Sequence, residues 1–383
     1  CRLDCVLMKD LYPEIEPYRS ERLASGEFLR EVIASDGSSS QSLEKRNGET
    51  ESTHADGTRE IVREGPDPRF GMLAPITELQ QLETPAGLVS TTSRERAVEL
   101  AVPGDPLSLV SLTDTVEVND RVSTSQYLAT TRTWTYTSPE GRTSSVQLNE
   151  KGRPEVSSSG GLAPTDIGYD PRGRIDAVTQ GEGADARLTA FTYDPEGYLE
   201  SITDAEDRVV RFDYDPVGRV TRQVLPDLRE ILYDYDANGN LASLTPPGRP
   251  PHLFDYDAVD QQAQYTPPEL LGITDPATRY AYNLDKQLTR ITRPDGRSVD
   301  LGYDPTTGQL LTVTIPRGVY RYGYDPTSGD RTTIEDPDGG ILSFGYDGPL
   351  LTQRDWSGAI SGSVIQSHNN DLNLVSRSVN GGH

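Results

Sequence analysis

A short phrase, tyrosine-aspartate followed by a turn, returns through most of the chain at an almost constant spacing. In "FDYDPVGRV", residues 212–220, it combines aromatic, acidic, proline and glycine residues within a few positions. Counted from the first clear copy, the steps between the tyrosines are 24, 21, 21, 21, 26, 21, 21 and 22 residues. A repeat of this period predicts that one small structural unit is stacked many times. The tyrosines that mark the copies are Tyr169, Tyr193, Tyr214, Tyr235, Tyr256, Tyr282, Tyr303, Tyr324 and Tyr346.

Each copy predicts a strand, a turn, a second strand and a second turn. Apolar side chains occupy every second position before the tyrosine, as in Val210, Phe212 and Tyr214, which is typical of a strand with one buried face. The aspartate and proline that follow suit a type I turn, and a glycine suits its fourth position. A second turn, such as "PDGR" at Pro294, closes the unit. The turn glycines expected to be structural are Gly173, Gly197, Gly218 and Gly239.

The expected fold class is all-β, with antiparallel strand repeats stacked into one long curled sheet, a spiral shell or solenoid, and no substantial helix. We expect an irregular N-terminal segment over 1–50, degenerate β repeats over 51–125 and a YD-repeat array over 126–383. Residues 13–33 also allow a short helix or a strand. The stretch 367–382 still scans as half a repeat, with His368 in the tyrosine slot. Its strand edge is therefore expected to continue into further shell or to pair with a second copy.

Composition excludes several classes of partner. The chain has 60 acidic and 36 basic side chains and a formal net charge of −24, which opposes binding to nucleic acid and to anionic membranes. This acidity suits a solvated surface, with a surface for cations or a basic partner as the alternative. No apolar run approaches the roughly 18 residues that cross a bilayer, so no direct membrane insertion is expected.

The cysteines lie only at the N-terminal end of the sequence. Cys1 and Cys5 are too few for a disulfide framework, but they could pair with each other or with residues outside this sequence. A chain that starts at cysteine rather than methionine indicates a processed piece, and an N-terminal cysteine also occurs in lipid-modified bacterial lipoproteins.

The strongest chemical motif in the sequence is also explained by the repeat. "DYDANGN", residues 234–240, fits the first half of a calcium loop. The twelfth position counted from Asp234 is Thr245 rather than glutamate, and the flanking residues predict strands where a calcium loop needs helices. Asn238 and Gly239 are also good turn residues. We therefore interpret the motif as a repeat turn.

No arrangement of residues indicates catalysis. The repeated aspartates occupy equivalent turns, whereas glycoside hydrolysis needs two carboxylates in unlike environments. The four histidines have no metal-ligand spacing, and the sequence contains neither a G-x-S-x-G string nor a glycine-rich phosphate loop. We expect no catalytic, cofactor-binding or metal-binding residues, no cofactor and no enzyme activity.

The "YDxxGRL"-type units, with "PDGR" turns between them, resemble the YD repeats of the rearrangement hotspot (RHS) family, which are similar to the large extracellular part of animal teneurins. The stretch "HADGTREIVREGPDPRFGMLAPI", residues 54–76, resembles a segment upstream of the repeats in bacterial members. The resemblance implies a spiral β-sheet wound into a hollow shell. In bacterial relatives such a shell often encloses a toxic C-terminal domain, and in teneurins it is a scaffold for adhesion. The chain lacks the "DPxGL" motif near which toxin members cleave themselves, so no autoproteolytic residues are assigned.

The sequence thus predicts a noncatalytic wall segment of a large secreted or surface-displayed bacterial protein. Its expected partners are the rest of a parent shell and an enclosed C-terminal toxin domain, with edge-to-edge self-association as a further possibility. The alternative is an adhesion module in which tyrosines and acids bind a glycan or a receptor. An enzyme would need a concave cluster of unlike titratable groups, which the sequence does not show.

Overall fold

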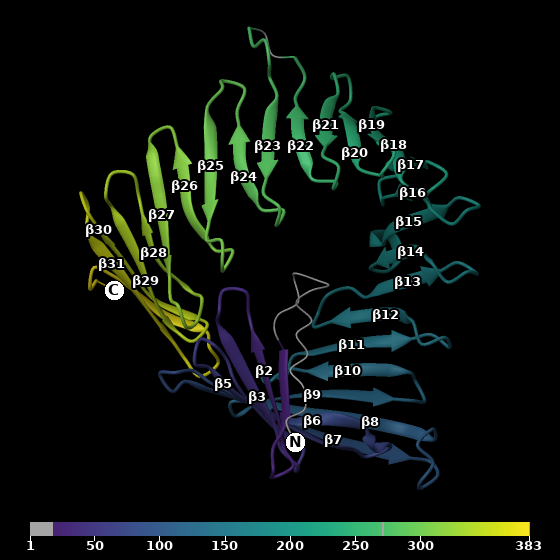
Figure 1. Ribbon diagram of the computed structural model, residues 1–383. Helices are drawn as coiled ribbons and strands as arrows, with labels where there is room; N and C mark the ends of the chain where they lie inside the picture. The colour runs from purple at the N-terminus through teal and green to yellow at the C-terminus, as the bar shows by residue number, and fades with distance from the viewer. Residues whose placement is uncertain (1–17, 270–271, 383) are drawn as a thin grey trace. The chain divides into compact units, whose positions relative to one another are not determined.

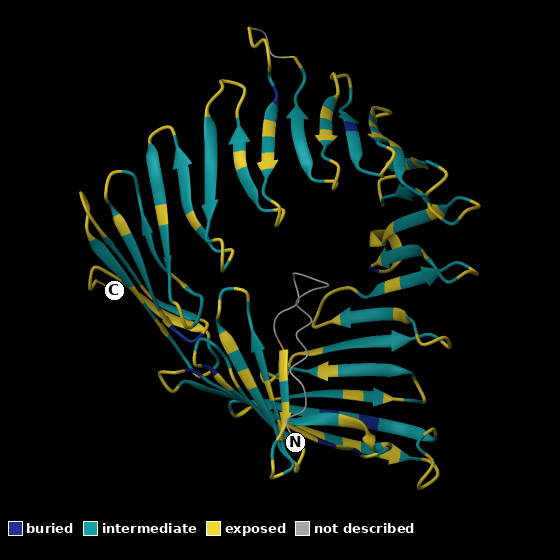
Figure 2. Cartoon of the chain, viewed as in Figure 1, coloured by how far each residue is buried: buried dark blue, intermediate teal, exposed yellow. Residues whose placement is uncertain are grey.

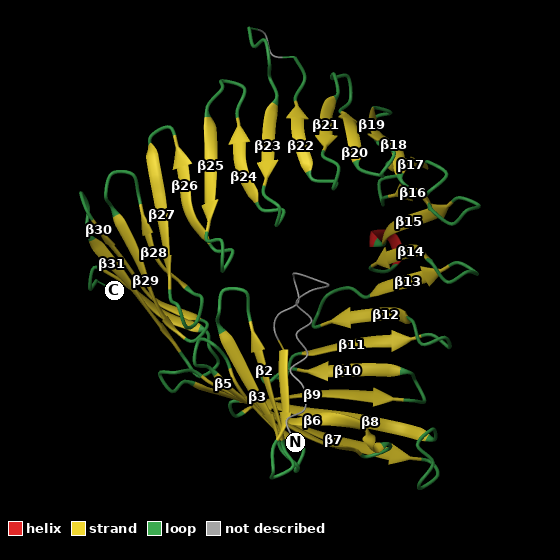
Figure 3. Ribbon diagram, viewed as in Figure 1, coloured by secondary structure: helices red, strands yellow, loops and turns green. Residues whose placement is uncertain are grey.

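The computed structural model describes residues 18–269 and 272–382, and these residues form antiparallel β-strands that belong to one sheet (Figure 1). The expected all-β fold class is confirmed, because the described residues contain 32 strands and a single helical turn, the 3-10 element η1 (Gly183–Asp185) (Figure 3). Cys1 and Cys5 lie outside the described residues. The chain divides into two compact units: unit 1 takes in residues up to 130, 136–141 and from 301 onward, and unit 2 takes in 131–135 and 142–300.

Unit 1 begins with nine strands, each hydrogen-bonded to the next along the chain. Residues 18–50, expected to be irregular, instead form four of these strands in regular register. The sequence pattern failed there because strands such as "SSQSLE" carry almost no apolar side chains, while their short glycine turns still set the pairing. The nine strands are β1 (Tyr18–Arg22), β2 (Phe28–Ile33), β3 (Ser39–Glu44), β4 (Glu49–Thr53), β5 (Arg59–Asp67), β6 (Gly71–Glu83), β7 (Val89–Leu100), β8 (Leu109–Val118) and β9 (Arg121–Leu128).

The second part of unit 1 is the C-terminal run of repeats. Its strands again pair each with the next. They are β26 (Leu310–Ile315), β27 (Gly318–Tyr324), β28 (Arg331–Glu335), β29 (Ile341–Asp347), β30 (Leu350–Ser357), β31 (Gly362–His368) and β32 (Leu374–Val379).

Unit 2 carries the most regular repeats, and its successive strands fan around an arc (Figure 1). From β11 onward each strand pairs with the next. After β10 (Thr133–Thr137), the strands are β11 (Thr143–Leu148), β12 (Pro154–Ser159), β13 (Thr165–Tyr169), β14 (Ile175–Gln180), β15 (Arg187–Tyr193), β16 (Leu199–Thr203), β17 (Val209–Tyr214), β18 (Val220–Val224), β19 (Glu230–Tyr235), β20 (Leu241–Thr245), β21 (His252–Tyr256), β22 (Gln262–Thr266), β23 (Thr278–Tyr282), β24 (Leu288–Thr292) and β25 (Ser298–Tyr303).

The register gives the sheet of unit 2 two chemically different faces. On one, which we call the aromatic face, Tyr233 lies opposite Leu244, and Phe254 lies opposite Tyr265. On the other, which we call the polar face, neighbouring positions form polar cross-strand pairs, for example Asp234 with Ser243 at 2.8 Å. Because side chains alternate along a strand, one register fixes both faces at once. The aromatic face includes Phe212, Tyr233, Phe254, Tyr265 and Tyr280. The polar face includes Asp213, Arg222, Asp234, Ser243, Asp255 and Gln264.

Few side chains in the described residues are fully buried (Figure 2). Leu112 and Ala277 are the buried hydrophobic residues, and the aromatic face is mostly half-buried. A sheet without a second layer packed on it has no continuous core, so its stability must come mainly from ladder hydrogen bonds and contacts between neighbouring strands.

Candidate functional site: the repeat lock and the seam

The marker tyrosines each tie one repeat to the previous one. In eight of the nine, the phenolic hydroxyl donates to the carbonyl oxygen of the residue that begins the second strand of the preceding repeat, at 2.7–3.1 Å. Tyr214, for example, donates to Leu199, the first residue of β16. Tyr303 ends β25 at the same position of its repeat. A half-buried phenol needs such an acceptor, and here the acceptor lies on the neighbouring unit. The bonded tyrosines are Tyr169, Tyr193, Tyr214, Tyr235, Tyr256, Tyr282, Tyr324 and Tyr346.

The aspartate after the tyrosine organises the turn that follows. At Asp215 the carboxylate accepts hydrogen bonds from the backbone N–H groups of Val217 and Arg219 and an ion-paired bond from the Arg219 Nε at 2.7 Å. The Gly218 N–H donates to the Asp215 carbonyl at 3.0 Å. This is the turn expected from the sequence: the aspartate caps it, and the glycine, at φ +86°, takes the left-handed position.

The other three predicted glycines occupy the same place in their turns. Each has a positive φ and donates its N–H to the carbonyl of the turn aspartate three residues earlier. They are Gly173, Gly197 and Gly239, at φ +86°, +108° and +98°.

The arginine at the end of the turn connects two repeats. Arg219 pairs with Asp215 of its own turn, and its guanidinium lies over the ring of Tyr235 in the next repeat, 4.6 Å from the ring centre. Arg174 does the same with Asp170 and Tyr193 at 4.0 Å. The Asp–Arg–Tyr chain and the tyrosine hydrogen bond together form what we call the repeat lock.

The ionisable groups of the lock respond to this environment. Hydrogen bonds from the Arg219 backbone N–H, and then from its side chain, hold the pKa of the Asp215 carboxyl below its ordinary value. Partial burial raises the pKa of the Tyr214 and Tyr235 phenols. At neutral pH the aspartates are therefore charged and the tyrosines are neutral, as the lock requires.

A second set of contacts, which we call the seam, lies in unit 1 between strand turns far apart in the sequence. The carboxylate of Asp347 accepts 2.7 Å hydrogen bonds from the Thr84 hydroxyl and the Ala86 backbone N–H. Asp347 and Thr84 are 7% and 2% exposed, so the hydrogen bond between their side chains is shielded from water. The adjacent Gly348 lies so close to Thr58 that an added Cβ would be 2.3 Å from the Thr58 hydroxyl oxygen.

The seam continues at the turns on either side. Asp371, after β31, accepts a 2.6 Å hydrogen bond from the Asn119 amide and pairs with Arg121 at 2.5 Å. The turn that holds Gly329, after β27, comes against Asp36. Three consecutive turns that follow tyrosine-position residues thus contact turns of the N-terminal strands.

The seam residues could not be predicted from the sequence. Asp347 is the aspartate of a tyrosine-aspartate pair, but its repeat reads "YDGPL", in which glycine and proline stand in other positions than in the regular turn and no arginine follows. Strand β29 continues through Asp347, which pairs with Leu350, so the carboxylate is free to bind 263 residues back along the chain. The departure from the repeat was the available signal, whereas Thr84 and Asn119 stand in no recognisable pattern.

The segment 54–76, singled out by its resemblance, contributes Asp67 to a charge cluster with Arg96 and Asp114. Arg96 on β7 forms a two-pronged bond to Asp114 on β8 at 2.6 and 2.7 Å, and a 2.9 Å bond to Asp67. Asp67 is 3% exposed and also accepts the backbone N–H groups of Arg69 and Phe70. The hydrogen bond to Asp114 raises the pKa of Arg96, so the guanidinium stays charged. The cluster fastens the β5–β6 turn onto β7 and β8.

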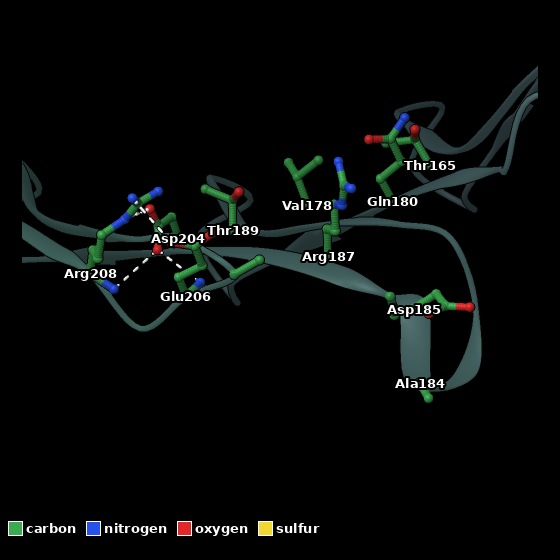
Figure 4. Close-up of a pocket in the computed structure, with 12 residues that line it drawn as sticks. Thr165, Val178, Gln180, Ala184, Asp185, Arg187, Thr189, Asp204, Glu206 and Arg208 are labelled. Carbon is green, nitrogen blue, oxygen red and sulfur yellow. Dashed lines mark hydrogen bonds and ion pairs between the residues drawn. The ribbon is translucent and has the colours of Figure 1, made fainter.

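A shallow polar depression in unit 2 is lined by several ionisable side chains (Figure 4). The connector 181–186, where the repeat step is 24 rather than 21 residues, forms one side through Asp185. The next connector forms the other, where Arg208 pairs with Asp204 at 2.7 Å and Glu206 at 3.1 Å. Figure 4 shows Arg187 projecting from the sheet away from these acids. The ionisable side chains that line the depression are three acids, Asp185, Asp204 and Glu206, and two arginines, Arg187 and Arg208.

The calcium-like motif forms an ordinary repeat turn. Asp236 accepts the backbone N–H groups of Asn238 and Asn240 at 2.9 Å, in the manner of Asp215. Across residues 18–269 and 272–382, no three His, Cys, Asp or Glu side chains are grouped to hold a metal ion. No helix in that part of the chain is long and apolar enough to cross a membrane.

Known proteins similar to this chain include one family and several solved structures. A family model described as Teneurin YD-shell matches residues 11–376. Among solved structures, the chain is similar to a Photorhabdus luminescens Tc holotoxin pore, with 15% identity and a TM-score of 0.48 over 98% of this chain. It is also similar to a TcdB2-TccC3-TEV crystal structure, with 14% identity and a TM-score of 0.49 over 97% of this chain. The chain spans 23% of the length of each of these. No curated protein matches it.

Proposed function

Because the chain belongs to the Teneurin YD-shell family, we propose that it is a noncatalytic wall segment whose aromatic face holds a polypeptide enclosed by the shell. Family membership confirms the resemblance indicated by the repeats. The repeat lock would set the spacing of the wall, and the seam would fix its N-terminal strands against its C-terminal repeats.

The observation that carries the proposal is the pair of unlike faces on a single-layer sheet. On the polar face, side chains hydrogen-bond to one another across neighbouring strands, as Ser243 does with Asp234. On the aromatic face, the Tyr233 hydroxyl donates to Gln223 at 3.3 Å and the Tyr265 hydroxyl is hydrogen-bonded to His252 at 2.7 Å, while the rings stay half-exposed. A contiguous apolar surface of this kind favours contact with another polypeptide.

We propose further that the enclosed polypeptide is a C-terminal toxin domain of the same parent protein. The parent would be secreted or displayed at the cell surface. Family membership supports a structural shell, and the strongly acidic composition is compatible with an extracellular protein.

The test is binding of a fluorescent, carboxymethylated polypeptide that cannot fold, measured by anisotropy with the full chain. The double variant Tyr233→Lys, Phe254→Lys places two charges on the aromatic face and should weaken binding of the polypeptide several-fold. The control double variant Leu232→Lys, Leu253→Lys changes the adjacent residues, so it places the same charges on the polar face and should leave binding of the polypeptide unchanged.

Two results would count against the proposal. Equal effects of the two double variants would show that the faces are not distinguished by a bound chain. Selective micromolar binding to one glycan on an array, with no affinity for the unfolded polypeptide, would favour the adhesion module instead.

A further inference from the structure

The connector before β15 departs from the regular repeat and changes the surroundings of one arginine. In regular repeats, the arginine six residues before the marker tyrosine stands in the connector turn and pairs with the aspartate of that turn. Arg208 pairs with Asp204 at 2.7 Å, and Arg229 pairs with Asp227 at 2.6 Å. Arg187 holds the same position before its own tyrosine, but it forms no ion pair with any described residue. The departure thus leaves one arginine without its acid.

The extra residues of this connector move Arg187 into the sheet. The repeat step here is 24 residues, and the β14–β15 ladder ends on the pair Gln180 with Arg187. The next ladder stops one pair earlier, at Thr203 with Val209. Asp185 lies on the helical turn η1, and Figure 4 shows its side chain and that of Arg187 pointing in different directions. The arginine is therefore a strand residue rather than a turn residue.

Arg187 lies in a row of polar side chains on the aromatic face of unit 2. Thr165 is opposite Gln180, and Gln180 is opposite Arg187, so the three form one row across β13, β14 and β15. Adjacent strands are about 4.8 Å apart, so the row extends about 10 Å. Thr189 and Phe191 follow Arg187 on the same side of β15, which places the row beside the aromatic residues.

The row is open to a ligand. Its free groups are one guanidinium, one amide and two hydroxyls, all able to donate to an anion. The depression that contains them has a volume of about 980 Å³, so it has room for a short segment of chain. The side chains that line it and form no hydrogen bond or ion pair with any described residue are Thr165, Gln180, Arg187 and Thr189.

A free guanidinium attracts an anion here despite the acidity of the whole chain. The net charge is −24, but at physiological ionic strength exposed charges more than about 8 Å apart are largely screened. The nearest acids therefore matter most. Asp204 and Glu206, which line the same depression, are already paired with Arg208.

We propose that this row binds a carboxylate of a polypeptide held on the aromatic face. A guanidinium matches the two oxygens of a carboxylate, and the amide of Gln180 would donate to the same group or to a backbone carbonyl beside it. Phe191 offers an apolar contact four residues along β15 from Arg187, about 13 Å away. The partner is therefore an extended segment with an acidic and an apolar side chain about four residues apart. This inference rests on the proposed function, because it specifies the chain that the aromatic face would hold.

The test measures binding of two short blocked peptides, each labelled with an uncharged dye, to the full chain by fluorescence anisotropy. The first has a phenylalanine with a glutamate about four residues to either side, and the second has glutamine in place of both glutamates. We expect the glutamate peptide to bind about threefold more tightly, as is typical of an exposed charge pair. Arg187→Gln should abolish this preference. Arg229→Gln removes the same charge from an arginine that already pairs with Asp227, so it is the matched control and should leave the preference unchanged.

A second measurement locates the bound peptide. With benzoylphenylalanine in place of phenylalanine, crosslinks identified by mass spectrometry should fall within residues 187–204. Crosslinks only to other strands would overturn the proposal, as would equal affinity of the unmodified chain for the two peptides or a preference that survives Arg187→Gln. If free glucuronate displaces the glutamate peptide at a lower concentration than acetate does, the row recognises a sugar acid and the polypeptide assignment is wrong.

The outcomes separate this row from the proposed function. If both peptides bind equally and the Tyr233→Lys, Phe254→Lys variant weakens both, the aromatic face holds a polypeptide but the row is not a carboxylate site. If the glutamate preference depends on Arg187 while that double variant has no effect, the row stands and the wider face does not. If neither peptide binds, the row is overturned, whatever the unfolded polypeptide does.

Discussion

Removing the hydroxyl of Tyr214 tests the repeat lock directly. The phenol donates to the Leu199 carbonyl at 2.9 Å, and its ring stacks on Tyr198 with the centres 5.0 Å apart. Phenylalanine keeps the stack and loses the one hydrogen bond, which at a half-buried site contributes about 0.5–1.5 kcal/mol. We expect Tyr214→Phe to destabilise β16 and β17 by about 1 kcal/mol.

The assay must be local, because about 1 kcal/mol shifts the melting temperature of a large cooperative unit by only a few degrees. Native-state hydrogen exchange should show amide protection in β16 and β17 falling about fivefold. Tyr198→Phe is the matched control, since the Tyr198 hydroxyl has no hydrogen-bond partner among the described residues. The same loss of protection in both variants, or in neither, would refute the lock.

Other predictions concern the turns, the seam and pH. Gly218→Ala should lower the free energy of unfolding, measured in urea, by about 1–3 kcal/mol, and by more than Gly296→Ala does. Both glycines have a positive φ, but only at Gly218 would an added Cβ meet a side chain, 2.5 Å from a tyrosine hydroxyl. Equal losses in the two variants would assign the effect to φ alone. Asp347→Ala leaves the buried Thr84 hydroxyl and the Ala86 backbone N–H without this acceptor, and it should speed proteolysis at 84–88, with a cost of about 1–3 kcal/mol. Asp236→Ala should act through the turn, and calcium or chelator should leave the melting temperature unchanged; a shift of several degrees would restore the calcium interpretation. The turn aspartates have a lowered pKa in the folded chain, so the stability that they contribute is present above about pH 4 and is lost as the pH falls below that value. The lock tyrosines have a raised pKa in the folded chain, so the stability that they contribute is present below about pH 10 and is lost above it. A melting temperature that stays constant through both limits would contradict these two expectations.

The strands and turns that depend on residues a few positions apart could be predicted from the sequence. Alternation before Tyr214 predicts its strand, and Asp215 with Gly218 predicts its turn, because each depends only on residues a few positions apart. The two faces follow from the same alternation. Repetition made these inferences strong, since an accidental pattern would not recur at one spacing.

The sequence could not show which distant segments meet. The bond between Thr84 and Asp347 depends on how the strands of unit 1 accumulate twist, and neither residue carries a signal of the other. The acceptor of the tyrosine hydroxyl was likewise hidden, because Leu199 contributes only its backbone. The polar strand β3 escaped recognition because its pairing comes from turns rather than from apolar alternation.

The irregular steps of the repeat have a consequence for how such a chain can vary. The 24-residue and 26-residue steps add their extra residues in the connectors before β15 and β23, at the edge of unit 2 opposite the turn glycines. The hydroxyl bonds of Tyr193 and Tyr282 survive these insertions at 2.7 and 2.9 Å. One margin of the sheet therefore keeps a fixed pitch while the other accepts added length, so new loops can be grafted onto the connector margin without disturbing the spacing of the repeats.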